Sequence, residues 1–167
     1  MLAQKINHNI WIREQDHPAI SLPRWQQQVD LINDLYQSEA TVILQSNGDR
    51  GQITCSSPQQ TGNAFAAGDM LQREGLIDAI CETVSYGLVP FEPAKLGGSF
   101  AVFNTLLAIK LTWPDGRLFG CLVICNPASD KISATSAAVC ETVKALIQGE
   151  LKQMYMMEQL QRMSVQD

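Results

Sequence analysis

Five cysteines are the side chains of this sequence best suited to redox or metal chemistry, because a thiolate is both a nucleophile and a metal ligand. None belongs to a C-x-x-C pair, and both histidines lie in the first twenty residues, so the spacing does not support a zinc site. Cys121 and Cys125 are four residues apart on a predicted strand, about 13 Å at the usual rise, which is too far for a disulfide. We therefore interpret the cysteines as small buried residues in a reducing compartment: Cys55, Cys81, Cys121, Cys125 and Cys140.

A second group of candidate residues combines aromatic rings with opposite charges in one short segment. It consists of Phe91, Glu92, Lys95, Phe100 and Phe103. Aromatic walls with a few polar groups are typical of a small-molecule pocket. The same phenylalanines would also suit a core, and the sequence leaves both interpretations open. It contains no Gly-rich phosphate loop after a strand, no Cys–His–Asn set and no nucleophile elbow, so we predict no catalytic residues and no metal ligands.

The element that must position these groups is a hairpin around Pro114-Asp115-Gly116. Pro presets φ, Asp can hydrogen-bond its own backbone, and Gly accepts a positive φ, so the three residues predict a turn. One predicted strand face carries Leu107, Ile109, Leu111 and Trp113 before the turn and Leu118, Leu122 and Ile124 after it. The opposite face carries Phe119, Cys121, Val123 and Cys125. Because the second strand is apolar on both faces, we expect it at the centre of a sheet that is covered on both sides.

Two further patterns precede this hairpin. Pro23 suits the first turn of a helix, and an apolar stripe predicts that the helix runs to about residue 38. The stripe consists of Trp25, Val29, Ile32 and Tyr36. Residues 40–46 and 52–56 are rich in strand-forming residues and flank a Gly-containing loop, which predicts a second hairpin.

A helix and a short strand are predicted between the two hairpins. Asp69 and Gln72 have the spacing of a capping box, so we expect a helix from residue 69 to residue 84, with Gly87 just beyond its end. Its buried stripe would be Ile77, Ile80, Cys81 and Val84. Residues 88–91 predict a short strand, and residues 92–99 predict a loop.

The last predicted helix, residues 134–163, is long enough to leave the body of the domain. Thirty residues give about 45 Å of helix, whereas a compact chain of this length has a radius of gyration of about 15 Å. Its apolar stripe continues into the second half, and an exposed stripe of this kind favours a partner helix. We therefore predict a homodimer through Leu146, Leu151, Met154, Met157 and Leu160.

Composition limits the class of protein. At 167 residues and 46% hydrophobic, the chain suits one globular domain. A net charge of −5 disfavours a nucleic-acid partner, which needs clustered Lys and Arg. No apolar run reaches the roughly 18 residues of a membrane span, and the N-terminus has no apolar signal region. We expect a cytoplasmic protein with an arm at residues 1–20, a sensor domain at 21–150 and a signalling helix with a linker at 151–167.

Two motifs resemble those of GAF domains, which are small-molecule sensor modules. The segment W-P-D-G-x-x-F-G-x-x-x-x-x-N, from Trp113 to Asn126, resembles the GAF hairpin, although the family usually has Asp at the last position. The tetrad Cys81-Glu82-Thr83-Val84 resembles a helix end of the same family. The resemblance implies an α+β fold of the PAS/GAF type, in which a central, mostly antiparallel sheet of about six strands has helices on both faces. The first and last helices would cover one face, and the 69–84 helix with the aromatic loops the other.

The resemblance also implies where a ligand would bind, but not which ligand. In similar domains the segment that contains Phe91, Glu92, Lys95, Phe100 and Phe103 forms the wall of the ligand crevice. The family's bilin-binding members attach the pigment at a Cys-His pair, and its cyclic-nucleotide binders use an Asn-Lys-Phe-Asp-Glu set. This sequence has neither, so pigment and cyclic nucleotide are disfavoured and the small molecule is unknown.

The same resemblance leaves three functions to be compared. The first is a sensory and regulatory domain of a signal-transduction protein. Residues 160–167 resemble the linker that precedes diguanylate cyclase (GGDEF) domains, so the regulated output would be a cyclase of cyclic di-GMP signalling, or a histidine kinase in its place. The second is a cysteine-dependent redox enzyme that resembles the GAF-type free methionine sulfoxide reductases, although the cysteine spacing here does not match a redox set. The third is a dimerisation scaffold without a ligand.

Overall fold

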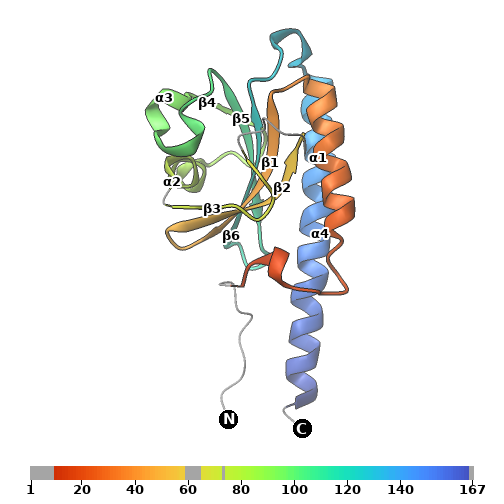
Figure 1. The fold of residues 1–167 in the computed structure, drawn as a ribbon. Helices are drawn as coiled ribbons and strands as arrows, with labels where there is room; N and C mark the ends of the chain where they lie inside the picture. The colour runs from red at the N-terminus through yellow and green to blue at the C-terminus, as the bar shows by residue number, and fades with distance from the viewer. Residues whose placement is uncertain (1–9, 59–64, 73, 166–167) are drawn as a thin grey trace.

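The computed structural model describes residues 10–58, 65–72 and 74–165, which form one antiparallel sheet with helices on both faces (Figure 1). The six strands of these residues lie in the order β3-β2-β1-β6-β5-β4. In chain order the elements are η1 (Ile12–Glu14), α1 (Leu22–Tyr36), β1 (Ala40–Asn47), β2 (Arg50–Ser57), β3 (Met70–Leu71), α2 (Gly75–Glu82), β4 (Val89–Phe91), α3 (Pro93–Leu96), η2 (Gly98–Phe100), β5 (Leu106–Thr112), β6 (Leu118–Cys125), η3 (Ser129–Lys131) and α4 (Ala134–Val165). This architecture confirms the predicted α+β fold.

The central hairpin pairs β5 with β6, as predicted, but its second strand contains a β-bulge. Thr112 pairs with Leu118, whereas the preceding residue Leu111 pairs with Gly120. Phe119 is therefore an extra residue on β6, and it breaks the strict alternation of faces along that strand. The strand β6 also pairs with β1, so the two hairpins of the chain meet at the centre of the sheet.

The bulge reverses two face assignments made from the sequence. Phe119 lies on the α1–α4 face, where its ring packs edge-on against Trp25 and Trp113 at centroid distances of 6.0 and 5.5 Å. Leu118 packs on the opposite face, against the α2 side of the core. The prediction for both residues was wrong because a period of two does not hold across a bulge. Gly120 permits the close approach, since a Cβ at that position would meet the backbone of β1.

The first helix, α1, confirms the predicted stripe. Ser21 caps it, because the Oγ atom of Ser21 accepts the backbone N–H of Arg24 at 3.3 Å. Pro23 lies in the first turn, where a missing N–H does no harm. The four predicted residues are buried between α1, α4 and the sheet: Trp25, Val29, Ile32 and Tyr36.

The helix α2 is shorter than predicted. It spans Gly75–Glu82, and residues 70–71 form the edge strand β3 instead. The Asp69 Oδ2 atom accepts the N–H of Ala66 and so closes a turn, not a helix N-terminus. Cys81 and Val84, predicted to be buried, are exposed. Gly75 also allows α2 to pack closely on α3, because a Cβ at that position would collide with the carbonyl group of Leu96.

The described part of the N-terminal arm, residues 10–20, is packed on the domain. Ile12 is buried in the same cluster as α1 and α4. The Gln45 side chain in β1 holds this segment, because its Oε1 atom accepts the N–H of Ile12 at 2.9 Å and its Nε2 atom donates to the carbonyl of Ile10 at 3.1 Å. Residues 1–9 of the predicted arm lie outside the described residues, as do residues 166–167 of the predicted linker.

The last helix, α4, contains 32 residues and extends past the body of the domain, as predicted (Figure 1). Its first turn is fixed by Ser133, whose Oγ atom accepts the N–H of Ser136 at 3.1 Å, while the Ser136 Oγ atom accepts the N–H of Ser133 at 3.0 Å. Among the helices that the structure describes, none is both long and apolar enough to cross a membrane.

Candidate functional site

The predicted aromatic segment lies beside an open cavity at the β4 edge of the sheet, which we call the β4 groove. Its volume is about 700 Å³, which lies within the usual range of small-molecule pockets. Three chain segments form it: β4 with the start of α3, residues 101–107, and the residues between β6 and α4. Its walls include Phe91, Glu92, Val102, Phe103, Asn104 and Ile132.

Of the five predicted ligand-binding residues, the structure brings three to this groove. Phe91, Glu92 and Phe103 line it. Phe100 does not, because it is fully buried and stacks on Phe65 with a centroid distance of 4.8 Å. Lys95 lies on the adjacent surface, where its Nζ atom is 3.2 Å from the Glu92 carboxylate. Phe100 therefore belongs to the core, and Phe103, which is 7% exposed, is buried in the same cluster although it also borders the groove.

Asn126 positions Asn104 and Thr105 in the lining of the groove, a role that the sequence did not reveal. Its backbone has a φ of 54°, a left-handed conformation in which Asn is favoured over most residues. The Asn126 Oδ1 atom accepts the N–H groups of Asn104 and Thr105 at 2.8 and 3.1 Å, and its Nδ2 atom donates to Glu39 at 2.7 Å. The residue that departs from the usual Asp of the motif thus uses its amide group as both acceptor and donor.

Glu74 anchors the loop that follows α3, and it was also missed. It is buried, and its carboxylate accepts the N–H of Ser99 and, at 2.7 Å, the Ser99 hydroxyl. The loop approaches so closely that a Cβ at Gly98 would collide with the Glu74 carboxylate. Gly97 and Gly98 both have positive φ values, of 68° and 70°. A Gly-Gly pair followed by Ser was the available sequence signal, but its partner lies far away in the chain.

Four of the cysteines are buried, and burial disfavours the thiolate form. It raises the pKa of the Cys55 and Cys121 thiols to about 12, and it also raises the pKa of Cys125 and Cys140. A thiol with a raised pKa stays protonated at neutral pH and is a poor nucleophile. Cys81 is exposed on α2. Within the described ranges, no group of three His, Cys, Asp or Glu side chains could hold a metal ion.

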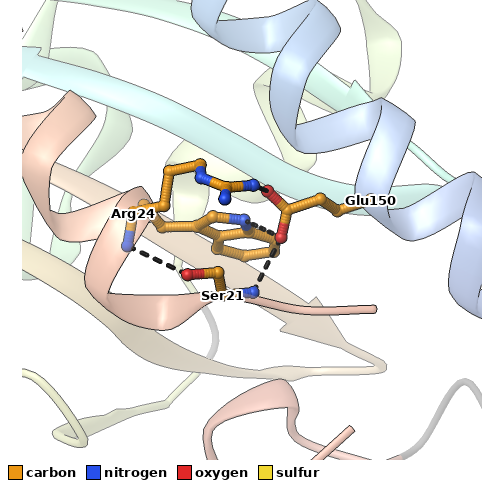
Figure 2. A network of polar contacts seen from close by, with 4 residues as sticks. Ser21, Arg24 and Glu150 are labelled. Atoms are coloured by element: carbon orange, nitrogen blue, oxygen red, sulfur yellow. Dashed lines mark hydrogen bonds and ion pairs between the residues drawn. The ribbon is translucent and has the colours of Figure 1, made fainter. Parts of the chain in front are cut away.

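A buried carboxylate joins the two long helices (Figure 2). The Glu150 Oε1 atom in α4 accepts the backbone N–H of Ser21 at 2.7 Å and the Trp25 Nε1–H at 3.1 Å. Its Oε2 atom lies 3.5 Å from the Arg24 guanidinium. The N-terminal end of α1 is therefore fixed to the middle of α4 by three donors. This contact gives α4 a defined rotation relative to the sheet.

The five residues predicted for a dimer interface divide into two groups. Leu151 and Met154 are buried against the domain's own core, with 0% and 6% of their surfaces exposed. Leu146, Met157 and Leu160 are 40%, 39% and 63% exposed. The second group is the exposed part of the predicted stripe, and we call these three residues the α4 surface stripe.

Comparison with known proteins shows which solved structures have a similar architecture. No protein-family model and no curated protein matches the sequence. Among solved structures, the GAF domain of an Acinetobacter phosphoenolpyruvate-protein phosphotransferase has a TM-score of 0.59 at 19% identity, over 79% of this chain and 82% of that one. The phycoerythrobilin-bound GAF domain of a cyanobacterial phytochrome has a TM-score of 0.61 at 10% identity, over 83% and 89%. The blue-light absorbing form of the Thermosynechococcus elongatus PixJ GAF domain has a TM-score of 0.54 at 13% identity, over 87% and 93%.

These identities are too low to transfer a ligand, but the similarity covers most of both chains in each comparison. The structure therefore confirms what the hairpin motif implied about architecture: this chain has the GAF fold.

Proposed function

We propose that this chain is a sensory domain that binds a small molecule in the β4 groove and regulates a signal-transduction protein as a homodimer. The observation that carries this proposal is the β4 groove. It is lined by Phe91, Glu92 and Phe103, three residues of the segment for which the GAF resemblance implied a ligand crevice. Two of the structural neighbours are a phycoerythrobilin-bound domain and a blue-light absorbing domain, which supports a sensory role for the fold. A bilin is disfavoured as the ligand, because the sequence has no Cys-His pair at which the family's bilin-binding members attach the pigment.

The walls of the groove define the class of ligand. Phe91, Phe103 and Ile132 supply apolar surface, whereas Glu92 and Asn104 supply the polar groups of the lining. A ligand with an apolar body and a hydrogen-bonding group would match this combination. The Glu92 carboxylate is already paired with Lys95, so the site does not demand a cationic ligand.

Native mass spectrometry of the purified domain tests this binding function. We expect a retained small molecule that is lost in Val102→Glu, because Val102 lines the groove and is 76% exposed, so the charge enters the groove without disturbing the core. Val84→Glu is the matched control, since Val84 is 92% exposed and lies outside the groove. A domain that carries no molecule, and binds none from a metabolite extract, would favour the dimerisation scaffold without a ligand.

Dimerisation is proposed through the α4 surface stripe. Leu146→Glu with Met157→Glu should give a folded monomer, because each change places a charge in a desolvated contact. Leu151→Glu is the informative contrast: Leu151 is buried in the domain, so its substitution should unfold the chain. Sedimentation velocity distinguishes these results. An unchanged oligomer in the double variant would exclude the stripe as the interface.

The output of the sensor is proposed to be a diguanylate cyclase joined to α4, on the basis of the linker resemblance of residues 160–167. If α4 transmits orientation, inserting two residues after Leu160 rotates the output by about 200°, whereas seven residues nearly restore the phase. Ligand-dependent cyclase activity should therefore be lost with two added residues and retained with seven. Equal regulation in both insertion variants would contradict transmission by α4.

The cysteine-dependent redox enzyme receives no support from the described cysteines. Four thiols are buried with raised pKa values, which disfavours a thiolate nucleophile. The direct test is turnover of free methionine sulfoxide with thioredoxin as reductant. Activity that disappears in Cys81→Ser would replace the sensory proposal with the enzymatic one.

A further inference from the structure

A second concave site lies on the opposite side of α4 from α1, next to the central hairpin. Its volume is about 490 Å³. One wall is the β5–β6 turn, with Trp113 and Gly116; the other is α4, with Ala145, Gln148, Gly149 and Lys152. The exposed ring of Tyr86 completes its rim. We call this site the α4 groove, and none of its lining residues belongs to the β4 groove.

Its floor is open because α4 carries small residues there. A Cβ at Gly149 would meet no atom within 4 Å, and Ala145 precedes it by one helical turn on the same face. The Gln148 side chain closes the inner end, because its Oε1 atom accepts the Thr112 N–H at 2.9 Å. Glycine inside a helix lowers stability relative to alanine. The open space at Gly149 is therefore formed by a residue that stabilises the helix less than alanine would.

Three lysines lie at or beside the wall of the α4 groove: Lys110, Lys144 and Lys152. Lys144 and Lys152 lie four residues on either side of Gln148 and so share its helix face. The Nζ atoms of Lys110 and Lys144 are 5.3 and 5.4 Å from the centroid of the Tyr86 ring. They donate to the carbonyls of Thr83 and Tyr86, at 2.7 and 2.6 Å.

These ammonium groups have little carboxylate compensation. No carboxylate of the described residues lies within 4.0 Å of any of the three Nζ atoms. The Glu141 carboxylate attracts the Lys144 ammonium group, whereas the Lys110 ammonium group repels it. Three ammonium groups without a close ion pair among the described residues, in a chain of net charge −5, favour a bound anion.

We propose that the α4 groove binds a small aromatic anion. Its carboxylate or phosphate group lies at Lys152, which lines the groove, with Lys144 beside it at Tyr86, and its ring lies between Tyr86 and the turn that carries Gly116. The site does not depend on the β4 groove. Gly149 is three residues from Leu146, so a ligand here would adjoin the α4 surface stripe and could act directly on the signalling helix.

Isothermal titration calorimetry with 2-naphthoate tests the proposal. We expect 2-naphthoate to bind and the neutral 2-naphthamide to bind about tenfold more weakly, because the amide lacks the charge. Lys144→Gln with Lys152→Gln should weaken 2-naphthoate by about tenfold, which corresponds to about 1.4 kcal/mol. Lys95→Gln, which removes an exposed lysine outside the groove, is the matched control and should have no effect.

A filling variant separates this site from others. Gly149→Leu places a side chain in the groove and should abolish 2-naphthoate binding while raising the melting temperature, since leucine is a better helix former. Equal affinity for naphthoate and naphthamide would overturn the proposal, as would undiminished binding in Gly149→Leu. Binding that is lost in Val102→Glu but not in Gly149→Leu would place the probe in the β4 groove and overturn it as well.

Discussion

The two faces of the sheet are covered in different ways. On one face, α1 and α4 are long helices whose apolar stripes pack into a continuous buried cluster, and Glu150 joins them. On the other face, the eight-residue α2, the four-residue α3 and the loops around Gly97 and Gly98 cover the sheet. The β4 groove borders the second face.

This difference shows where a GAF fold can vary its chemistry. Long helices have many residues in each apolar stripe, so each contact is supported by its neighbours and the face stays closed. Short helices and loops depend on a few specific contacts, such as Glu74 with Ser99 and Asn126 with Asn104. Such contacts can be changed individually, and the space between them can be shaped for a ligand.

The largest effect is expected on the helix face. Phe119→Ala should lower the free energy of unfolding by about 3–5 kcal/mol, because the ring is fully buried between Trp25 and Trp113 and leaves a closed cavity. Urea denaturation measures this change. Leu118→Ala is the adjacent control, and its partly buried side chain should cost less. Equal losses would contradict the face assignment that the bulge produces.

The polar contact of that face ranks next. Glu150→Ala should cost about 3 kcal/mol, because it leaves two donors, Ser21 N–H and Trp25 Nε1–H, without their acceptor. Glu158→Ala, which removes a carboxylate 3.8 Å from His17 on the surface, should cost less than about 1 kcal/mol. Urea denaturation measures both losses. Equal stability of the two variants would contradict the larger role of the Glu150 carboxylate.

Two phenylalanines test the other face. Phe103→Ala should cost about 1.5–3 kcal/mol, the value for apolar transfer alone, because its side chain lines the open groove and water can fill the space. Phe100→Ala should cost more, because Phe100 stacks on Phe65 in the closed core. Ligand binding, measured alongside, should change in Phe103→Ala. Phe103 is buried in the same cluster as Phe100, so identical stability losses would show that water from the groove does not fill the space left by its side chain.

A stabilising change is expected at Gly149. Gly149→Ala should raise the free energy of unfolding by about 0.5–1 kcal/mol, because alanine is favoured in a helix interior and its Cβ meets no neighbour. Gly120→Ala is the opposite control: a Cβ there would meet the backbone of β1, and the variant should be destabilised. Thermal melting of both variants distinguishes a helical from a packing requirement for glycine.

Cysteine reactivity gives the smallest change, since it leaves the fold intact. At pH 8, iodoacetamide should modify Cys81 first, because it is exposed. Cys55 and Cys121 should stay unmodified in the folded domain, because both are buried and a pKa raised to about 12 keeps both thiols protonated at pH 8. Mass spectrometry of the modified peptides measures this order. Fast labelling of Cys55 at pH 8 would show that β2 opens locally.

The sequence determined the elements whose signals are periodic and local. The stripe of Trp25, Val29, Ile32 and Tyr36 predicted α1, and the Pro114-Asp115-Gly116 turn predicted the central hairpin, because each feature repeats within a few residues and burial follows directly from it. The length of α4 was predicted for the same reason. The hairpin motif also implied the GAF fold through its resemblance to that family.

Tertiary contacts decided the rest. The bulge at Phe119 forms in the pairing of β6 with β5, and the close packing of Gly75 in α2 on α3 likewise arises only in the folded chain. Periodicity on α4 marked Leu151 as apolar but could not distinguish the domain's own core from an exposed surface. Glu74, Asn126 and Glu150 act on partners 21 or more residues away, and a single sequence contains no signal for such pairings. These residues have their roles because the chain brings their partners to them only after folding.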